Sequence, residues 1–216
     1  MKQKLQILCV ALLALVLCNT PLFAHDFAVD GIYYKITSST NKTVEVTCRG
    51  DDFNSYSNEY SGAVTIPESV TYNGNTYSVT SIRANAFKAC SSLTSVVIPN
   101  SVTSIGEAAF SGCSSLTSVE IPNSVTSIGE AAFCDCSNLE TIIIPKGVAR
   151  IGEIAFLGCI FLTNITCLIP ADKIFAISPN VFENKISKTL YVPKGAKWTY
   201  KETEGWYGFQ KTIELK

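Results

Sequence analysis

The chain repeats itself every 23 residues, and this period constrains its fold more than any other feature. A phenylalanine, a cysteine and a leucine each recur at this step. The recurring residues are Phe87, Phe110, Phe133 and Phe156; Cys90, Cys113, Cys136 and Cys159; and Leu93, Leu116, Leu139 and Leu162. A period between 20 and 50 residues is typical of a solenoid, in which each unit stacks on its neighbours.

Within one unit the apolar spacing predicts short strands, because it follows neither a sustained period of 3.6 nor a sustained period of 2. Val96 and Ile98 lie two residues apart and should face one side of a strand. Pro99 should end that strand, since it has no N–H to donate. We expect a second extended piece at residues 104–106 and one tight helical turn over residues 108–112. The apolar set of the unit is Leu93, Val96, Ile98, Val102, Ile105, Ala109 and Phe110.

The pattern Cys-x-x-Leu-x-x-Val-x-Ile-Pro-x-x-Val-x-x-Ile-Gly-x-x-Ala-Phe, read from Cys113 to Phe133, closely resembles the BspA-like leucine-rich repeats of bacterial surface and secreted proteins. The resemblance spans Ile82 to Cys167 and continues in weaker form to both ends. It implies a right-handed leucine-rich-repeat solenoid of short parallel β-strands, turns and short helical pieces. Similar proteins are associated with adhesion to host or bacterial surfaces. An asparagine ladder is not expected, because Ser101, Ser124 or Gly147 occupies the asparagine position.

Both ends of the repeat array depart from the pattern, as terminal repeats of a solenoid should. Residues 25–62 read as a β-rich N-terminal cap with strands at 31–36 and 43–48, and residues 63–168 read as the repeats. The first repeat carries a nine-residue insertion whose Asn73-Gly74 predicts a β-hairpin. Residues 169–216 read as a degenerate last repeat and a small C-terminal cap, with a strand motif at 190–193 and a short helix at 196–203.

Residues 1–24 read as a secretory signal peptide. A basic start is followed by an apolar run at residues 5–17, which is too short to span a bilayer. Cleavage after Ala24 would export the chain to the medium, the cell surface or the periplasm. The alternative is a lipoprotein acylated at Cys18, although Leu17 is large where a small residue is normally required. After removal of the leader we expect no insertion into a membrane.

The charge of the chain excludes several classes of partner. Without Lys2 and Lys4, the remaining 15 basic and 18 acidic residues give a net charge of −3. No basic stripe indicates a nucleic-acid interface, and no basic amphipathic helix indicates a membrane surface. The residues predict a monomer that binds an unidentified protein or surface ligand of host or bacterial origin, without a cofactor.

The cysteines are predicted to belong to the core. Cys90, Cys113, Cys136 and Cys159 share one repeat position and should form a column of buried thiols. Stacked disulfides and a metal site remain alternatives for this column. Cys48 and Cys167 also fall on predicted inward positions. Cys134 falls at a variable position, and its pairing with Cys136 only superficially resembles a metal or redox motif.

The sequence contains no recognisable catalytic constellation, so we do not expect an enzyme. The single histidine, His25, lies at the predicted mature terminus and is expected to be a mobile tail residue. The chain has no nucleophile elbow, P-loop or dinucleotide fingerprint. Glu107, Glu130 and Glu153 recur at the 23-residue step, and we interpret them as a solvated column, with a divalent-cation site as the alternative.

The remaining candidate for function is the exposed face of the predicted parallel sheet. Residues between the inward positions of each strand vary from unit to unit, and extended faces of solenoids bind partners. The predicted binding residues are Ser95, Val97, Ser118, Glu120, Thr141, Ile143, Asn164 and Thr166. One alternative is a carbohydrate-binding module using Tyr33, Tyr34, Tyr56, Tyr60, Trp198 or Trp206. The other is a hydrolase with its site in the caps.

Overall fold

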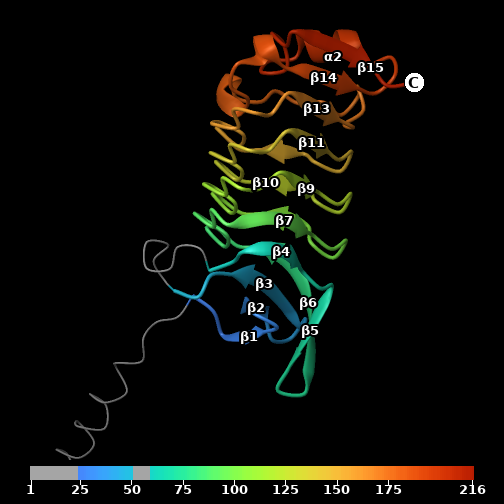
Figure 1. Ribbon diagram of the computed structural model, residues 1–216. Coiled ribbons are helices and arrows are strands. Elements are labelled where there is room, and N and C mark those ends of the chain that lie inside the picture. Colours follow the sequence, from blue (N-terminus) through green and yellow to red (C-terminus); the bar gives the residue numbers. More distant parts are fainter. Residues whose placement is uncertain (1–23, 51–58) are drawn as a thin grey trace, which may run out of the picture.

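The computed structural model describes residues 24–50 and 59–216, which form a stack of coils with a small β cap at one end and a helix at the other (Figure 1). Two ladders of short strands run along the stack. The first ladder contains β4 (Gly62–Thr65), β7 (Leu93–Val97), β9 (Ser118–Glu120), β11 (Thr141–Ile144), β13 (Asn164–Cys167), β14 (Thr189–Val192) and β15 (Lys211–Glu214). The second contains β6 (Asn75–Ile82), β8 (Ser104–Ile105), β10 (Ser127–Ile128) and β12 (Arg150–Ile151). The predicted leader, apart from residue 24, lies outside the described residues, as do Cys18 and Tyr56.

The first ladder is parallel, and its central strands pair at the 23-residue spacing of the repeat, which confirms the predicted solenoid. Ser95 pairs with Ser118, and Thr141 pairs with Asn164. The expectation of one continuous sheet is wrong, because the ladder divides into β4-β7-β9 and β11-β13-β14-β15. The break between β9 and β11 has no counterpart in the sequence, since 116–121 and 139–144 carry the same motif.

The segment after the second strand of each coil is a run of turns, so the helical turn expected over 108–112 is wrong. Ala108 and Gly112 have φ values of 49° and 76°, in the left-handed region. In a helix each N–H would donate to the carbonyl four residues back. Here every second N–H of the run donates to the next coil instead. These bonds join Ala108 to Glu130, Phe110 to Ala132 and Gly112 to Cys134, at 2.7 to 2.8 Å. The turns therefore form a third ladder between coils.

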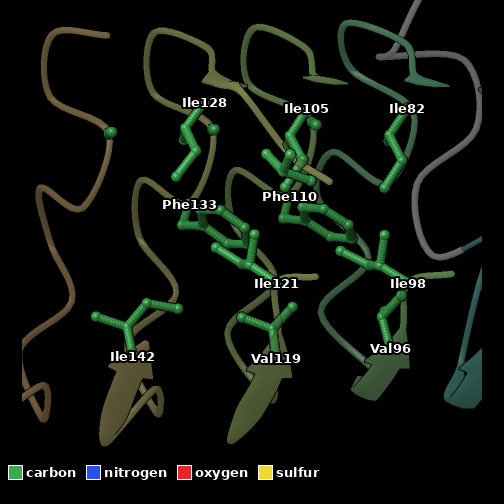
Figure 2. Packing of buried hydrophobic residues seen from close by; sticks show 14 of the residues in the cluster. Ile82, Val96, Ile98, Ile105, Phe110, Val119, Ile121, Ile128, Phe133 and Ile142 are labelled. Atoms are coloured by element: carbon green, nitrogen blue, oxygen red, sulfur yellow. The ribbon is translucent and has the colours of Figure 1, made fainter. Parts of the chain in front are cut away.

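The core is built from columns of equivalent side chains, which Figure 2 shows for the isoleucine, valine and phenylalanine positions. Five phenylalanine rings stack nearly parallel along the solenoid, with centroids 4.9 to 5.3 Å apart. They are Phe87, Phe110, Phe133, Phe156 and Phe182. Tyr60 packs on one end of this column and Trp206 on the other. The column therefore extends into both caps and joins them to the repeats.

The N-terminal cap is hydrogen-bonded into the solenoid. Its strands are β1 (Phe27–Val29), β2 (Ile32–Ser38), β3 (Thr43–Thr47) and β5 (Ser69–Tyr72). β1, β2 and β3 are antiparallel, and β3 then pairs in parallel with β6. The predicted hairpin at Asn73-Gly74 is confirmed, because it joins β5 and β6 with positive φ at both residues. The cap thus continues the second ladder and leaves the first ladder to end at β4.

The C-terminal end contains the predicted strand motif as β14, followed by the predicted short helix. The helical pieces are η1 (Pro179–Val181), η2 (Lys185–Ser187) and α2 (Lys197–Glu202). Beyond α2 the chain adds β15, a further parallel strand that the sequence did not indicate. Tyr200 of α2 is fully buried and donates its hydroxyl to the carbonyl of Ile169 at 2.7 Å. This contact fixes the helix over the end of the core.

Candidate functional site

The eight predicted binding residues all lie at outward positions of the first ladder, in β7, β9, β11 and β13. Their neighbours Val96, Val119, Ile142 and Ile165 point into the core. Val97 and Ile143 are 53% and 50% exposed, which is high for large aliphatic side chains. Ser118, Glu120 and Thr141 are also exposed, whereas Ser95, Asn164 and Thr166 are half-buried. The structure therefore brings these residues onto one surface, although two sheets carry them.

Strand register extends this surface beyond the residues that the sequence indicated. Ala63 and Thr65 on β4 pair with Ser95 and Val97, so they occupy the same two outward positions. At the other end the equivalent residues are Thr189 and Tyr191 on β14 and Lys211 and Ile213 on β15. We call these fourteen residues, two from each strand of the first ladder, the sheet face. The added residues were missed because their coils do not keep the 23-residue step.

The sheet face is almost free of charge. Glu120 is its only acid and Lys211 its only base. Val97, Ile143 and Ile213 are three of the eight large hydrophobic residues that are exposed in the described part of the chain. Depletion of charge at the centre is a compositional mark of protein interfaces.

A hollow of about 500 Å³ opens over the break between β9 and β11. Its walls include Val97 of β7, Glu120 of β9, Ile143 of β11 and Leu168. The hollow therefore lies where the first ladder passes from one sheet to the next, and it makes the centre of the sheet face concave. Glu120 is the only charged side chain that lines it.

The four cysteines of the column are buried in the core, where thiols of the column are hydrogen-bonded to backbone carbonyls. Each thiol reaches back to the preceding coil, where Cys113, Cys136 and Cys159 donate to the carbonyls of Phe87, Phe110 and Phe133 at 3.0 to 3.2 Å. All seven described cysteines are free; the four of the column are buried, and so is Cys167. Cys48 is only half-buried, and its thiol donates to the carbonyl of Gly50 at 3.2 Å.

The Cys134-x-Cys136 pair is separated by the fold. Cys136 is fully buried in the column, whereas Cys134 is only half-buried. The residue between them, Asp135, has a positive φ of 58°. Burial raises the pKa of both thiols, that of Cys134 to about 11. Neither residue therefore has the depressed thiol pKa of a redox-active cysteine.

We expect iodoacetamide to discriminate sharply among these thiols. In the folded protein the half-buried Cys48 and Cys134 should react before the column. Cys113, Cys136 and Cys159 should react only after denaturation. Because the pKa of Cys134 is raised and the thiolate is the nucleophile, its rate should keep rising with pH up to about 11. Mass spectrometry of timed samples measures both effects. Disulfides between column cysteines in the denatured, alkylated protein would contradict this arrangement.

The polar residues singled out in the sequence are three glutamates at the 23-residue step and the single histidine. Glu107, Glu130 and Glu153 are exposed on successive coils. His25 is no mobile tail residue, because its Nδ1 lies 2.8 Å from the carbonyl oxygen of Arg49 and its ring packs edge-on against Tyr33. Within residues 24–50 and 59–216, no three His, Cys, Asp or Glu side chains are grouped as metal ligands.

The aromatic residues named for carbohydrate binding are mostly buried. Tyr34, Tyr60 and Trp206 are 1%, 3% and 0% exposed and belong to the core. Tyr33 is half-buried, and only Trp198 is open, with the Nζ of Lys201 5.4 Å from its ring centre. An exposed aromatic platform of several rings is therefore not found among the described candidates.

Lys188 is a buried cation that the sequence did not indicate. Strand register places it opposite Thr163 of the preceding coil. It is 3% exposed, and its Nζ donates to the carbonyls of Cys159 and Leu162. Burial lowers the pKa of this lysine. The two carbonyl contacts link the degenerate coil to the repeat before it.

Comparison with known proteins places the chain among bacterial leucine-rich repeat proteins. Residues 78–203 match the BspA type leucine-rich repeat region in six copies. A leucine-rich repeat protein of Bacteroides ovatus is 31% identical, with a TM-score of 0.53 over 80% of this chain and 49% of its own. One from Bacteroides capillosus is 28% identical, with a TM-score of 0.54 over 65% of this chain and 96% of its own.

The fold is also similar to that of the pneumococcal vaccine antigen PcpA, at 18% identity and a TM-score of 0.60 over 88% of this chain and 47% of that protein. The chain thus spans about half the length of the B. ovatus protein. No curated protein matches the chain. Among the described residues, no helix has the length and hydrophobicity needed to cross a bilayer.

Proposed function

Because the chain belongs to the BspA-type leucine-rich repeat family, we propose that it is an exported, non-catalytic protein that binds a protein partner through the sheet face. The partner is a surface protein of a host or of another bacterium, and the chain acts in adhesion as a monomer. The observation that carries this proposal is the concave, nearly uncharged centre of the sheet face around Val97, Glu120 and Ile143.

Several features of the face support a protein as the ligand. Its seven strands present side chains at fixed spacing on a rigid scaffold, so little conformational entropy is lost on binding. Exposed Val97 and Ile143 flank Glu120, giving an apolar centre with one charge. Hot spots of protein interfaces lie in such central positions, where the partner excludes water. A carbohydrate ligand would instead favour aromatic platforms, and the face contributes Tyr191 alone.

The proposal predicts that Ile143→Arg abolishes binding and leaves folding intact. The side chain is 50% exposed, so arginine can be accommodated in the free protein, whereas a bound partner would bury its charge. Loss of a central contact costs about 2 kcal/mol or more, which is a loss of affinity of about 30-fold. A pull-down of the chain without its leader against host matrix and bacterial surface proteins supplies the partner, and calorimetry measures the affinity.

Two variants serve as controls for this experiment. Ile160→Arg makes the same change at a position that is 64% exposed but lies outside the sheet face. Glu130→Gln changes an exposed residue of the turn ladder, also away from the face. Both should bind as the parent does. Normal binding by Ile143→Arg, together with loss of binding on changes at Tyr33 or Trp198, would assign the function to the caps and refute the proposal.

A further inference from the structure

The first ladder ends at β4 in an edge with which no described strand of the N-terminal cap pairs. Among the described strands β4 pairs with β7 alone, whereas the cap strand β3 continues the second ladder through β6. Figure 1 shows β4 as the strand of the first ladder nearest the cap. Open edges of sheets are templates for pairing with another chain.

The backbone of β4 presents hydrogen-bonding groups to this edge. Thr65 pairs with Val97, and the N–H of the following residue, Ile66, donates to the carbonyl of Val97 at 3.0 Å. In a parallel ladder with this register, the N–H and C=O of Thr65 itself point away from β7. The side chains of β4 are Gly, Ala, Val and Thr, so none of the charges or prolines that usually protect an edge is present.

Two hollows lie along the edge and leave room for a chain beside it. One of about 300 Å³ is lined by Ala63, Val64 and Thr65 on one side and by the β1–β2 turn on the other. A second, of about 290 Å³, continues from Thr65 past Pro67 and Val70. Asp30, Ile32 and Thr65 line both hollows. Together the hollows form a slot along β4, which we call the edge slot.

The charge of the edge slot selects among extended ligands. Asp30 lines both hollows and is exposed, and Glu59 lines the first. No basic side chain is found among the described residues that line either hollow. The carboxylate of Glu59 accepts the N–H of Arg49 at 2.9 and 3.1 Å, which leaves Asp30 as the acid free to meet a ligand.

We propose that an extended segment of a partner protein, carrying a lysine or arginine, binds in the edge slot as an additional strand on β4. Main-chain hydrogen bonds to Thr65 supply the binding, as in other cases of strand addition, and Asp30 selects the basic side chain. The edge slot is separate from the centre of the sheet face. The proposal for the slot does not depend on the function proposed for the sheet face.

The experiment uses peptides as the probe. A phage-displayed library of random dodecapeptides is selected against the chain without its leader, and the enriched peptides are synthesised and titrated by fluorescence anisotropy. We expect the enriched sequences to alternate β-branched residues with at least one lysine or arginine. Failure to enrich any peptide, or enrichment of acidic ones, would overturn the proposal.

Matched variants then locate the binding. Thr65→Pro removes the outward N–H, and edge strands tolerate proline there, so affinity should fall about tenfold or more. Thr65→Val keeps the N–H and the shape and should bind as the parent does. Asp30→Asn should weaken basic peptides about threefold or more, and Ile143→Arg should have no effect. The proposal would be overturned if Thr65→Pro bound the peptides as tightly as the parent does, or if Ile143→Arg lost peptide binding.

A second measurement does not depend on the proline variant folding. In the parent protein the amide of Thr65 should exchange with deuterium rapidly, and bound peptide should slow that exchange about tenfold or more. Unchanged exchange would count against strand addition. Sedimentation tests the rival occupant, a second copy paired edge to edge at β4. A dimer that Thr65→Pro dissociates would assign the edge to self-association and overturn the proposal of a basic partner segment.

Discussion

Replacing Phe133 by alanine should destabilise the protein by about 3 to 5 kcal/mol, the usual range for a fully buried phenylalanine. The ring of Phe133 lies between those of Phe110 and Phe156, with centroids 5.1 and 5.3 Å away and planes within 6° of parallel. Its removal leaves a cavity in the middle of the column, where the second ladder and the turn ladder fix the spacing of the coils and limit collapse. Chemical denaturation followed by circular dichroism measures the loss.

Phe161→Ala is the matched control, because that phenylalanine is 56% exposed. Its effect should stay within about 0.5 kcal/mol, as for most surface substitutions. If both variants unfold at the same denaturant concentration as the parent, the stacked rings do not stabilise the solenoid.

Replacing Gly129 by alanine should be similarly disruptive for a different reason. A Cβ at this position would lie 2.5 Å from the carbonyl carbon of Gly106 and 2.6 Å from the N of Glu107. Both atoms are backbone, so the clash can be relieved only by moving two coils apart. That movement would stretch the bond from the N–H of Gly129 to the carbonyl of Ile105, now 2.9 Å. We expect a loss of about 3 kcal/mol, at the upper end for overpacking.

Gly195→Ala provides the comparison for this prediction. No atom lies within 4 Å of a Cβ built there, and the only penalty is a positive φ of 77°, worth about 1 to 2 kcal/mol. Thermal melts of the two variants should therefore differ clearly, with Gly129→Ala the less stable. A Gly129→Ala protein as stable as Gly195→Ala would mean that the coils are not packed this closely.

The repeat spacing was sufficient to predict the columns. Because Phe110, Cys113 and Leu116 recur at 23 residues, their equivalents must stack once the chain coils at that period, and the structure confirms this. Pro99 and Pro122 likewise marked where the first-ladder strands β7 and β9 end. The Asn73-Gly74 hairpin was predictable because two adjacent residues with positive φ strongly favour this pair.

Other features could not be predicted from the sequence. Ala108 adopts a left-handed φ that alanine intrinsically disfavours, and the hydrogen bonds to the next coil that compensate for it are visible only in three dimensions. Lys188 can be buried because two carbonyls of the preceding coil accept from its Nζ, and these contacts are visible only in the structure. β15 lacks the repeat motif, so its pairing with β14 depends on the tertiary fold.

The candidate site was predicted in part. Alternation along each strand correctly identified which side chains of β7, β9, β11 and β13 point outward, because that period is a property of any strand. The hollow was not foreseen, since it depends on the missing pairing of β9 with β11. Tyr191 and Ile213 were missed because the last coils step by 25 and 22 residues along the face.

Site-specific photo-cross-linking tests the central claim most directly. A photoreactive phenylalanine analogue is placed at position 143, in the centre of the sheet face, and in separate proteins at positions 160, 33 and 198. After incubation with the captured partner and irradiation, we predict a cross-linked complex from position 143 and none from position 160. Cross-linking from positions 33 or 198 with none from position 143 would contradict binding through the sheet face.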